Sequence, residues 1–178
     1  MKTISILSFL IITLVTVKPN FIYDFTSDSQ KDWQIVDDRV MGGVSQGGYT
    51  INQEGNGVFS GHVSLDNNGG FSSLMHPMDD FQIGDAKKVV LRLKGDKKSY
   101  QFRLKVKNSD SHSFIQTFET NGEWQEIEIP LNSFYASFRG RKMDMPNFSA
   151  EQIQEIRFLI ANYKEEDFRL EIDWIALK

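Results

Sequence analysis

The residues best suited to chemistry lie in one stretch, WQIVDDRVMGGVSQGGYT, at positions 33–50. Two adjacent carboxylates, Asp37 and Asp38, precede Arg39 and two pairs of glycines. Adjacent side chains at a strand end point to opposite sides, so these carboxylates cannot readily flank one scissile bond. Three roles stay open for them: ligation of calcium, an ion pair with Arg39, or hydrogen bonds to loop amides, which is the role we favour.

The glycines of this stretch do not form a nucleotide-binding motif. Phosphate-binding loops need a Lys-Ser/Thr ending or a G-x-G-x-x-G pattern at a helix start, and neither is present. Glycine also permits positive φ and close packing of a loop against a sheet. We therefore expect a rigid loop over residues 37–48 that displays Arg39 and Met41. Its glycines are Gly42, Gly43, Gly47 and Gly48.

Catalytic motifs of the commoner kinds are missing from the sequence. The chain has no cysteine, which excludes disulfides, thiolate metal sites and a cysteine nucleophile. No serine lies in a G-x-S-x-G elbow. If DNNGG closes a hairpin, His62 and His76 are diagonal neighbours, but a third nitrogen ligand is not close in sequence, so we expect surface histidines. We expect no catalytic residue and no cofactor; a bound metal, if there is one, would be a hard ion such as calcium.

A second charged stretch, FRGR, lies in the longest segment without a strand pattern, residues 131–147. Long loops in compact domains are often functional. Arginine suits the recognition of carboxylate or phosphate groups, and these arginines have an aromatic neighbour. A binding loop that uses Phe138, Arg139 and Arg141 and an ordinary solvated loop are equally good interpretations.

The elements that must position these residues are strands. SYQFRLKVKN alternates apolar and polar residues, the period-2 pattern of a strand with one buried face. Similar segments follow at short spacing, separated by turns such as DNNGG, GDKK and TNGE. They cover residues 21–25, 58–65, 71–76, 88–94, 113–120, 124–130, 156–162 and 168–177. The pattern predicts an all-β sandwich or jelly roll.

Length and composition agree with one globular domain. The chain has 178 residues, of which 40% are hydrophobic and 25% charged, with a formal net charge of −4. We therefore expect neither a nucleic acid nor an anionic membrane surface as a long-range partner. One short helix is predicted at residues 149–154, because Ser149 and Gln152 have the spacing of a capping box.

The first segment, MKTISILSFLIITLVTVKPN, has the layout of an export signal: one lysine, an apolar run from Ile4 to Val17, then Lys18. The run is shorter than the ~20 residues that span a bilayer, and no clear A-x-A cleavage site follows. We expect a signal peptide over residues 1–20, with an uncleaved anchor and hence membrane proximity as the alternative. The folded domain at 21–178 would then be periplasmic or extracellular.

Six segments together point to a family resemblance. They are WQIVDDRVMGGVS, VFSGHVSLDNNGGFSS, LRLKGDKKSYQFRLK, TFETNGEWQEIEIPLNSF, FRGR and LEIDWI. In this order they resemble the complex I intermediate-associated protein 30 family over nearly everything after residue 25. The family pattern D-D-x-M-G-G-x-S falls on Asp37, Asp38, Met41, Gly42, Gly43 and Ser45. The N-x-G-G-F element falls on Asn67, Gly69, Gly70 and Phe71, with Asn68 in the same turn.

The resemblance implies a galactose-binding-domain-like β-sandwich and a non-enzymatic role in assembling the membrane arm of NADH dehydrogenase. Mitochondrial members carry a transit peptide, whereas an exported protein cannot meet an intermediate on the matrix side. We therefore expect the fold to transfer and the partner to differ. The ligand would be a protein, contacted through Met41, the aromatics of SFYASF and the arginines of FRGR, or alternatively a glycan held by loop aromatics and Asp, Asn and Arg. A hydrolase that uses the Asp pair is least favoured.

Overall fold

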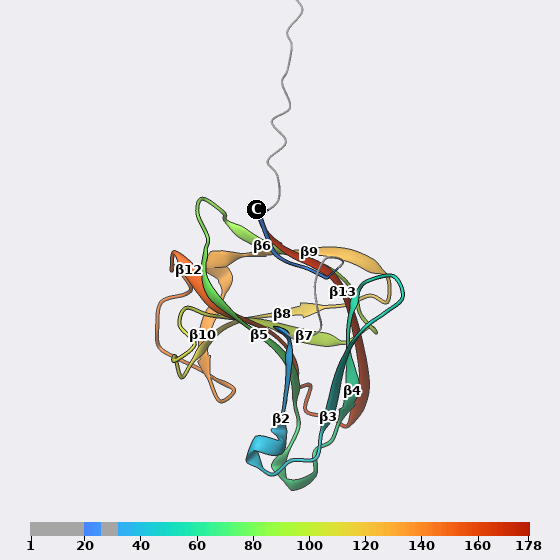
Figure 1. Ribbon diagram of the computed structural model, residues 1–178. Helices are drawn as coiled ribbons and strands as arrows, with labels where there is room; N and C mark the ends of the chain where they lie inside the picture. Colours follow the sequence, from blue (N-terminus) through green and yellow to red (C-terminus); the bar gives the residue numbers. More distant parts are fainter. Residues whose placement is uncertain (1–19, 26–31) are drawn as a thin grey trace, which may run out of the picture.

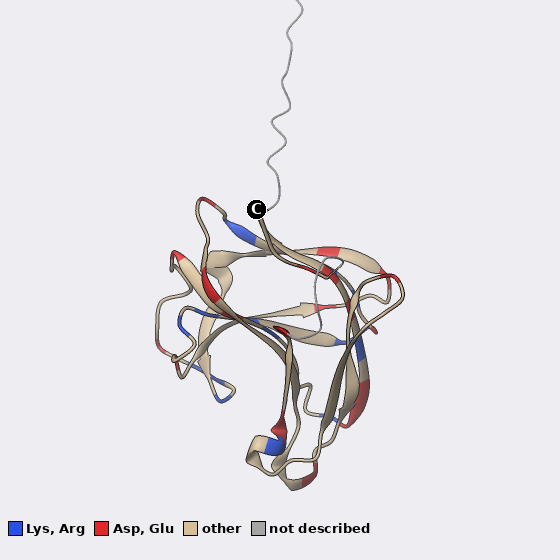
Figure 2. Cartoon of the chain, in the orientation of Figure 1, with Lys and Arg blue, Asp and Glu red and all other residues tan. Residues whose placement is uncertain are grey.

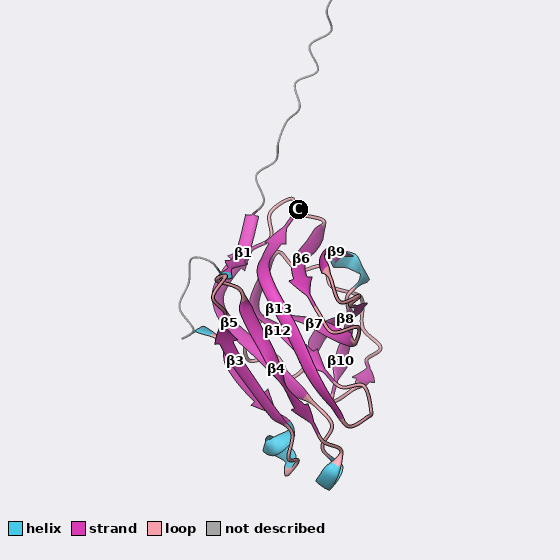
Figure 3. Ribbon diagram, turned by 90° about the vertical axis from the view of Figure 1, so that its right-hand side faces the viewer, coloured by secondary structure: helices cyan, strands magenta, loops and turns pink. Residues whose placement is uncertain are grey.

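The computed structural model describes residues 20–25 and 32–178. Its strands form two antiparallel sheets that pack face to face, as the views in Figure 1 and Figure 3 show. The six-stranded sheet contains β1 (Asn20–Asp24), β3 (Gln46–Ile51), β4 (Gly57–Val63), β6 (Lys88–Lys94), β9 (Trp124–Pro130) and β13 (Glu166–Leu177). The seven-stranded sheet contains β2 (Gln34–Asp37), β5 (Ser72–Gln82), β7 (Ser99–Lys105), β8 (Ser113–Glu119), β10 (Tyr135–Phe138), β11 (Arg141–Lys142) and β12 (Gln152–Ile160). The predicted all-β sandwich is confirmed.

The order of the strands determines where the chain crosses between the sheets. The six-stranded sheet runs β3-β4-β13-β6-β9, with β1 also paired to β13, and the seven-stranded sheet runs β11-β10-β8-β7-β12-β5-β2. Because β2 and β3 lie in different sheets, residues 38–45 form a crossover, and residues 64–71 form another between β4 and β5. Each crossover contains a 3-10 helix, η3 (Asp38–Met41) or η4 (Asp66–Asn68), and Figure 3 shows both helices at one end of the sandwich.

The alternation along β7 divides its residues between the core and the outer face. Tyr100, Phe102 and Leu104 are at most 1% exposed and point into the core between the sheets. Phe102 packs against Phe158 of β12 with ring centroids 5.0 Å apart, a contact worth about 0.5–1.5 kcal/mol beyond its buried area. The residues between them, including Arg103, are placed on the outer face of the seven-stranded sheet.

The predicted short helix at residues 149–154 is wrong. Gln152 begins β12, which pairs with both β5 and β7. The apolar residues Ile153, Ile156 and Phe158 of β12 are fully buried, and a register shift after Ile153 keeps them on the core face. Pairing on both edges satisfies the backbone of this segment, and this tertiary context overrides a local capping pattern.

Residues 131–147, which carry no strand pattern, are also more regular than expected. They contain the 3-10 helix η5 (Leu131–Ser133) and a hairpin of β10 and β11, in which Phe138 pairs with Arg141. Arg139 and Gly140 form its two-residue turn, with φ of 48° and 76°. Two central residues with positive φ are the requirement of a type I′ turn, which matches the twist of a hairpin.

The conditional hairpin between His62 and His76 does not form, since β4 and β5 belong to different sheets. His76 stacks on Trp33 with ring centroids 5.0 Å apart. His62 lies 2.8 Å from an Asp167 carboxylate oxygen and 3.3 Å from one of Glu165. The two histidines therefore lie in different sheets and do not form a shared ligand-binding site.

Candidate functional site

The buried carboxylate of Asp38 holds the two crossovers together. Asp38 is 0% exposed. It accepts hydrogen bonds from the Ser45 amide at 3.0 Å, the Gly70 amide at 2.7 Å and the Phe71 amide at 3.2 Å, and also from the Ser45 hydroxyl. Burial alone would raise the pKa of Asp38, but these hydrogen bonds outweigh it and hold the pKa below its usual value. The ionised carboxylate of Asp38 is therefore stabilised by hydrogen bonds from within the fold.

Asp37 makes a second, smaller set of bonds at the same junction. Its carboxylate accepts from the Gly47 amide at 3.0 Å and from the Ser72 hydroxyl at 2.7 Å. Arg39 is exposed and lies in no ion pair of 4.0 Å or less among residues 20–25 and 32–178. In the same ranges, His, Cys, Asp and Glu side chains form no group of three that could hold a metal ion. Of the three roles left open by the sequence, the observed bonds are those of carboxylates that cap loop amides.

Two glycines of the first crossover are required for different reasons. Gly42 has φ of 92°, and a Cβ there would meet nothing within 4 Å. A Cβ on Gly43 would lie 2.4 Å from Cγ and Oδ1 of Asp38, so this position needs space rather than positive φ. Residues 46–48 differ from the expected loop, because they form the start of β3 and pair with β4.

Beside this junction lies a groove of about 490 Å³ on the outer face of the seven-stranded sheet. Its floor includes Arg103 of β7 and Arg157 of β12. Its rim comes from η3, from the 64–71 crossover, from the β10–β11 turn and from the turn after β12. Pockets of 300–1,000 Å³ are typical of binding sites. The groove thus has a size suited to a binding site.

The charges that line the groove are all positive, in a chain with a net charge of −4. Arg103 and Arg157 occupy the floor, and Arg139 lies at the rim. Arg103 donates from Nε and Nη2 to Oε1 of Gln101 at 3.0 and 2.6 Å. Arg157 Nη2 lies 3.0 Å from a Glu155 carboxylate oxygen. The floor is therefore locally basic. The β10–β11 hairpin turn that borders it is also basic, and part of its ribbon is blue in Figure 2.

The rim also carries exposed apolar and aromatic side chains. Met41 is 62% exposed, Leu65 is 44% exposed and Tyr163 is 89% exposed, and all three line the groove. Side chains of this size are normally buried at least in part, so their convergence on one groove indicates a contact surface.

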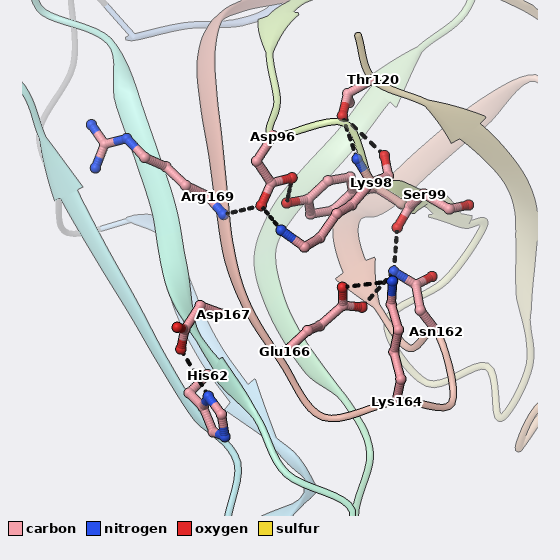
Figure 4. Close-up of polar contacts among 11 residues, drawn as sticks. His62, Asp96, Lys98, Ser99, Thr120, Asn162, Lys164, Glu166, Asp167 and Arg169 are labelled. Atoms are coloured by element: carbon pink, nitrogen blue, oxygen red, sulfur yellow. Dashed lines mark hydrogen bonds and ion pairs between the residues drawn. The ribbon is translucent and has the colours of Figure 1, made fainter. Parts of the chain in front are cut away.

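The turn that presents Tyr163 is fixed by polar contacts (Figure 4). Asn162 Nδ2 donates to the Ser99 carbonyl oxygen at 3.1 Å and to Glu166 Oε1 at 2.8 Å. Lys164 Nζ lies 3.2 Å from Glu166 Oε2. Tyr163 itself has φ of 58°, a conformation that non-glycine residues rarely adopt. The turn therefore projects the tyrosine outward at a defined place.

A neighbouring polar cluster serves the fold rather than chemistry. Asp96 accepts hydrogen bonds from the Tyr100 hydroxyl at 2.8 Å, from Lys98 Nζ at 2.7 Å and from the Arg169 amide at 2.9 Å (Figure 4). Burial, and then the Asp96 charge, raise the pKa of Tyr100 far above its usual value, which makes it unsuitable for proton transfer. Figure 4 also shows the contact between His62 and Asp167. This hydrogen bond raises the pKa of His62.

The structure separates the predicted binding residues into three sets. Those that line the groove are Met41, Gly69, Gly70 and Arg139. Those that build the junction beside it are Asp37, Asp38, Gly42, Gly43 and Ser45. Those that are exposed outside the lining are Arg39, Asn67, Phe138 and Arg141. Residues of the two crossovers and of FRGR thus meet at the groove, although most of the predicted residues do not line it.

Sequence analysis missed the floor of the groove. Arg103 was one polar position among several in an alternating strand, and its register with another strand is not a local property. Arg157 gave a stronger signal, since it interrupts the otherwise apolar run IRFLI. Tyr163 directly follows the strand predicted at residues 156–162, and its sequence context gave no signal of a role in the groove.

Comparison with known proteins identifies the family. The model of the complex I intermediate-associated protein 30 (CIA30) family matches residues 23–172. The chain belongs to the CIA30 family. A Caenorhabditis elegans relative, "Probable complex I intermediate-associated protein 30, mitochondrial", is 26% identical over 181 residues, covering 87% of this chain and 53% of the relative. A mouse CIA30 protein is 25% identical over 96 residues, covering 50% of this chain and 29% of that protein. The chain thus spans about half or less of these curated relatives.

Solved structures with a similar fold include carbohydrate-binding modules. A family 11 module from Clostridium thermocellum, solved in complex with a β-1,3-1,4-mixed-linked tetrasaccharide, has a TM-score of 0.66 and 17% identity, covering 91% of this CIA30 chain and 96% of the module. The family 11 module of the cellulase Lic26A-Cel5E has a TM-score of 0.67 and 18% identity, with 90% and 95% coverage. At these identities the likeness shows the jelly-roll fold alone. Helices long and apolar enough to cross a membrane are absent from the described residues.

Proposed function

We propose that this CIA30-family chain is a non-enzymatic binding module that holds a segment of a partner protein in the groove of the seven-stranded sheet. The observation that carries the proposal is the composition of the lining. Exposed Met41, Leu65 and Tyr163 surround a floor with arginines, and the lining contains no Asp or Glu among the described residues. Methionine, aromatic residues and arginine are the types enriched at protein interfaces, whereas aspartate and glutamate are depleted there.

Family membership supports an assembly or chaperone role for this binding. The names of the curated relatives refer to complex I intermediates. For this chain, the export-like segment at residues 1–20 suggests a partner in the periplasm or outside the cell, and an uncleaved form would bring the module close to a membrane. Residues 1–19 lie outside the described part of the chain. The domain at 21–178 and its location therefore form part of the proposal.

A glycan is the second candidate ligand. Two observations favour it: the jelly-roll fold shared with carbohydrate-binding modules and the exposed ring of Tyr163, which is suited to stacking on a sugar. The lining fits a neutral glycan less well. Its charged residues are arginines, and two nearby carboxylates are engaged elsewhere: Asp38 accepts hydrogen bonds from backbone amides, and Glu155 pairs with two cations. A protein segment therefore accounts for more of the lining.

Capture of a partner from an envelope extract, run beside a glycan array, tests the proposal. We expect the wild-type chain to retain a protein and to give no array signal. Met41→Ser combined with Tyr163→Ser should weaken capture roughly a thousandfold, because interface anchors of this kind contribute about 2 kcal/mol each and about 1.4 kcal/mol corresponds to a factor of ten. Met145→Ser is the matched control, since Met145 is also exposed but does not line the groove. Array signal without protein capture would replace the proposal by the glycan alternative.

A further inference from the structure

Two arginines face each other on the floor of the groove, in a placement that sheets normally avoid. Arg103 of β7 and Arg157 of β12 are direct partners in the antiparallel register. Directly opposed residues have Cβ atoms about 4.5–5.5 Å apart, and like charges at that separation destabilise the sheet. The fold alone gives no reason for this pair.

The nearby negative charge does not balance the pair. The buried carboxylate of Glu155 lies 3.0 Å from Arg157 Nη2 and 3.6 Å from Lys105 Nζ, so two cations already share it. Arg103 binds only the neutral amide oxygen of Gln101 at hydrogen-bond distance and has no ion pair within 4.0 Å among the described residues. An excess of positive charge therefore remains on the floor of the groove.

Arg103 is also half-buried. Burial, followed by the charge of Arg157, lowers the pKa of Arg103 to about 10. The guanidinium stays charged at neutral pH, yet it is partly desolvated without a counter-ion. A charge in this state is costly to the fold, and such local conflicts are concentrated at functional sites.

We propose that the Arg103–Arg157 pair binds a carboxylate side chain of the partner protein, an inference that rests on the proposed function. A guanidinium presents planar N–H donors that match the two oxygens of a carboxylate. The rim above the pair is apolar, with Met41 and Leu65 exposed. The segment recognised is therefore an acidic residue flanked by apolar residues, rather than a run of acidic residues alone.

Labelled peptides with the sequences LELEL, LQLQL and LKLKL provide the test, with the domain in its full chain and fluorescence anisotropy as the readout. We expect LELEL to bind about tenfold more tightly than LQLQL, since charge-assisted bonds are about twice as strong as neutral ones. LELEL should also shift the Nε–Hε NMR signals of Arg103 and Arg157. Arg103→Gln should weaken its binding about tenfold. Arg92→Gln, which removes an arginine from the outer face of the six-stranded sheet, should leave it unchanged.

Thermal melts separate recognition from a structural role. Arg103→Gln should melt at the same temperature as the wild type or higher, because it relieves repulsion with Arg157. Arg103→Lys keeps the charge without the planar fork, and should melt like the wild type while binding LELEL more weakly. A clear fall in melting temperature for Arg103→Gln would make this arginine structural and overturn the inference.

Two further outcomes would overturn the carboxylate assignment. One is equal binding of LELEL and LQLQL. The other is a shift of the arginine signals by inorganic phosphate or polygalacturonate at concentrations at which LELEL has no effect. Capture of an envelope protein that persists in Arg103→Gln would leave the proposed function intact and refute only the role of the arginine pair.

Discussion

The Asp38 junction and the arginine floor are two charged sites in one small sandwich, and they are organised in opposite ways. Asp38 is completely buried and accepts four hydrogen bonds from Ser45, Gly70 and Phe71. Arg103 is half-buried, binds a neutral amide and faces another arginine. The first charge is satisfied within the chain, whereas the second has no ion-pair partner among the described residues. The difference teaches that the conspicuous sequence motif builds the junction beside the candidate groove, whereas less conspicuous strand residues line the floor of the groove.

The largest effect is expected at the junction. Asp38→Ala should destabilise the domain by about 3–5 kcal/mol, because it leaves several buried donors without an acceptor. Asp37→Ala removes two bonds at a half-buried position and should cost about 1–2 kcal/mol. Urea unfolding measures both losses. A metal chelator in the same buffer should leave the free energy of unfolding of the wild type unchanged. Equal costs for the two variants would remove the distinction between Asp38 and its neighbour.

A smaller loss is expected at the glycine that contacts Asp38. Gly43→Ala should cost about 2–3 kcal/mol, since its Cβ would overlap the fixed carboxylate. Gly42→Ala has open space and should cost only about 1 kcal/mol of backbone strain. Thermal melts of both variants test the order. A more damaging change at Gly42 would mean that turn geometry, not the packing around Asp38, controls this crossover.

Acid should weaken the junction in a predictable direction. The pKa of Asp38 is lower in the folded protein than in the unfolded chain, so the unfolded state takes up the proton more readily. The contribution is complete above the unfolded value of about 3.9 and is lost as the pH falls through the lower native value. The free energy of unfolding, measured between pH 5 and 2.5, should fall more steeply for the wild type than for Asp38→Asn. Parallel slopes would show that Asp38 is not the residue that titrates.

The fold was predictable from the sequence because its signals are local. The alternation in β7 and the turns DNNGG and TNGE each concern neighbouring residues, and the strands that they predicted are present. The strand β10 was missed because small residues, Ala136 and Ser137, obscured its alternation. The helix at residues 149–154 was wrongly predicted because pairing with β5 and β7 decides the conformation there.

Only part of the candidate site could be predicted from the sequence, because the rest depends on how two strands are aligned in the sheet. The motif around Asp38 lies at the end of the molecule where the candidate groove is found, and Arg139 of the charged turn lines that groove. The pairing of Arg103 with Arg157 depends on the alignment of two strands separated by about fifty residues of chain. No local pattern reports that alignment, so the floor of the groove became visible only in three dimensions.

The smallest stability effect is expected at the hairpin turn. Arg139→Ala combined with Arg141→Ala should change the free energy of unfolding by no more than about 0.5 kcal/mol, because both side chains are exposed. Arg139 lines the groove, so the same variant should weaken capture of the partner. Melting and capture are measured on one preparation. A large loss of stability would assign the hairpin to the structural region with Asp38.

Photo-crosslinking from inside the groove tests the central claim most directly. Benzoylphenylalanine replaces either Tyr163, at the rim of the groove, or Phe21, an exposed residue of β1 in the other sheet. The account predicts a covalent protein adduct from position 163 alone, and its loss when Arg103→Gln and Arg157→Gln are added. Equal adducts from both positions, or capture of a partner without an adduct at position 163, would contradict the groove as the binding site.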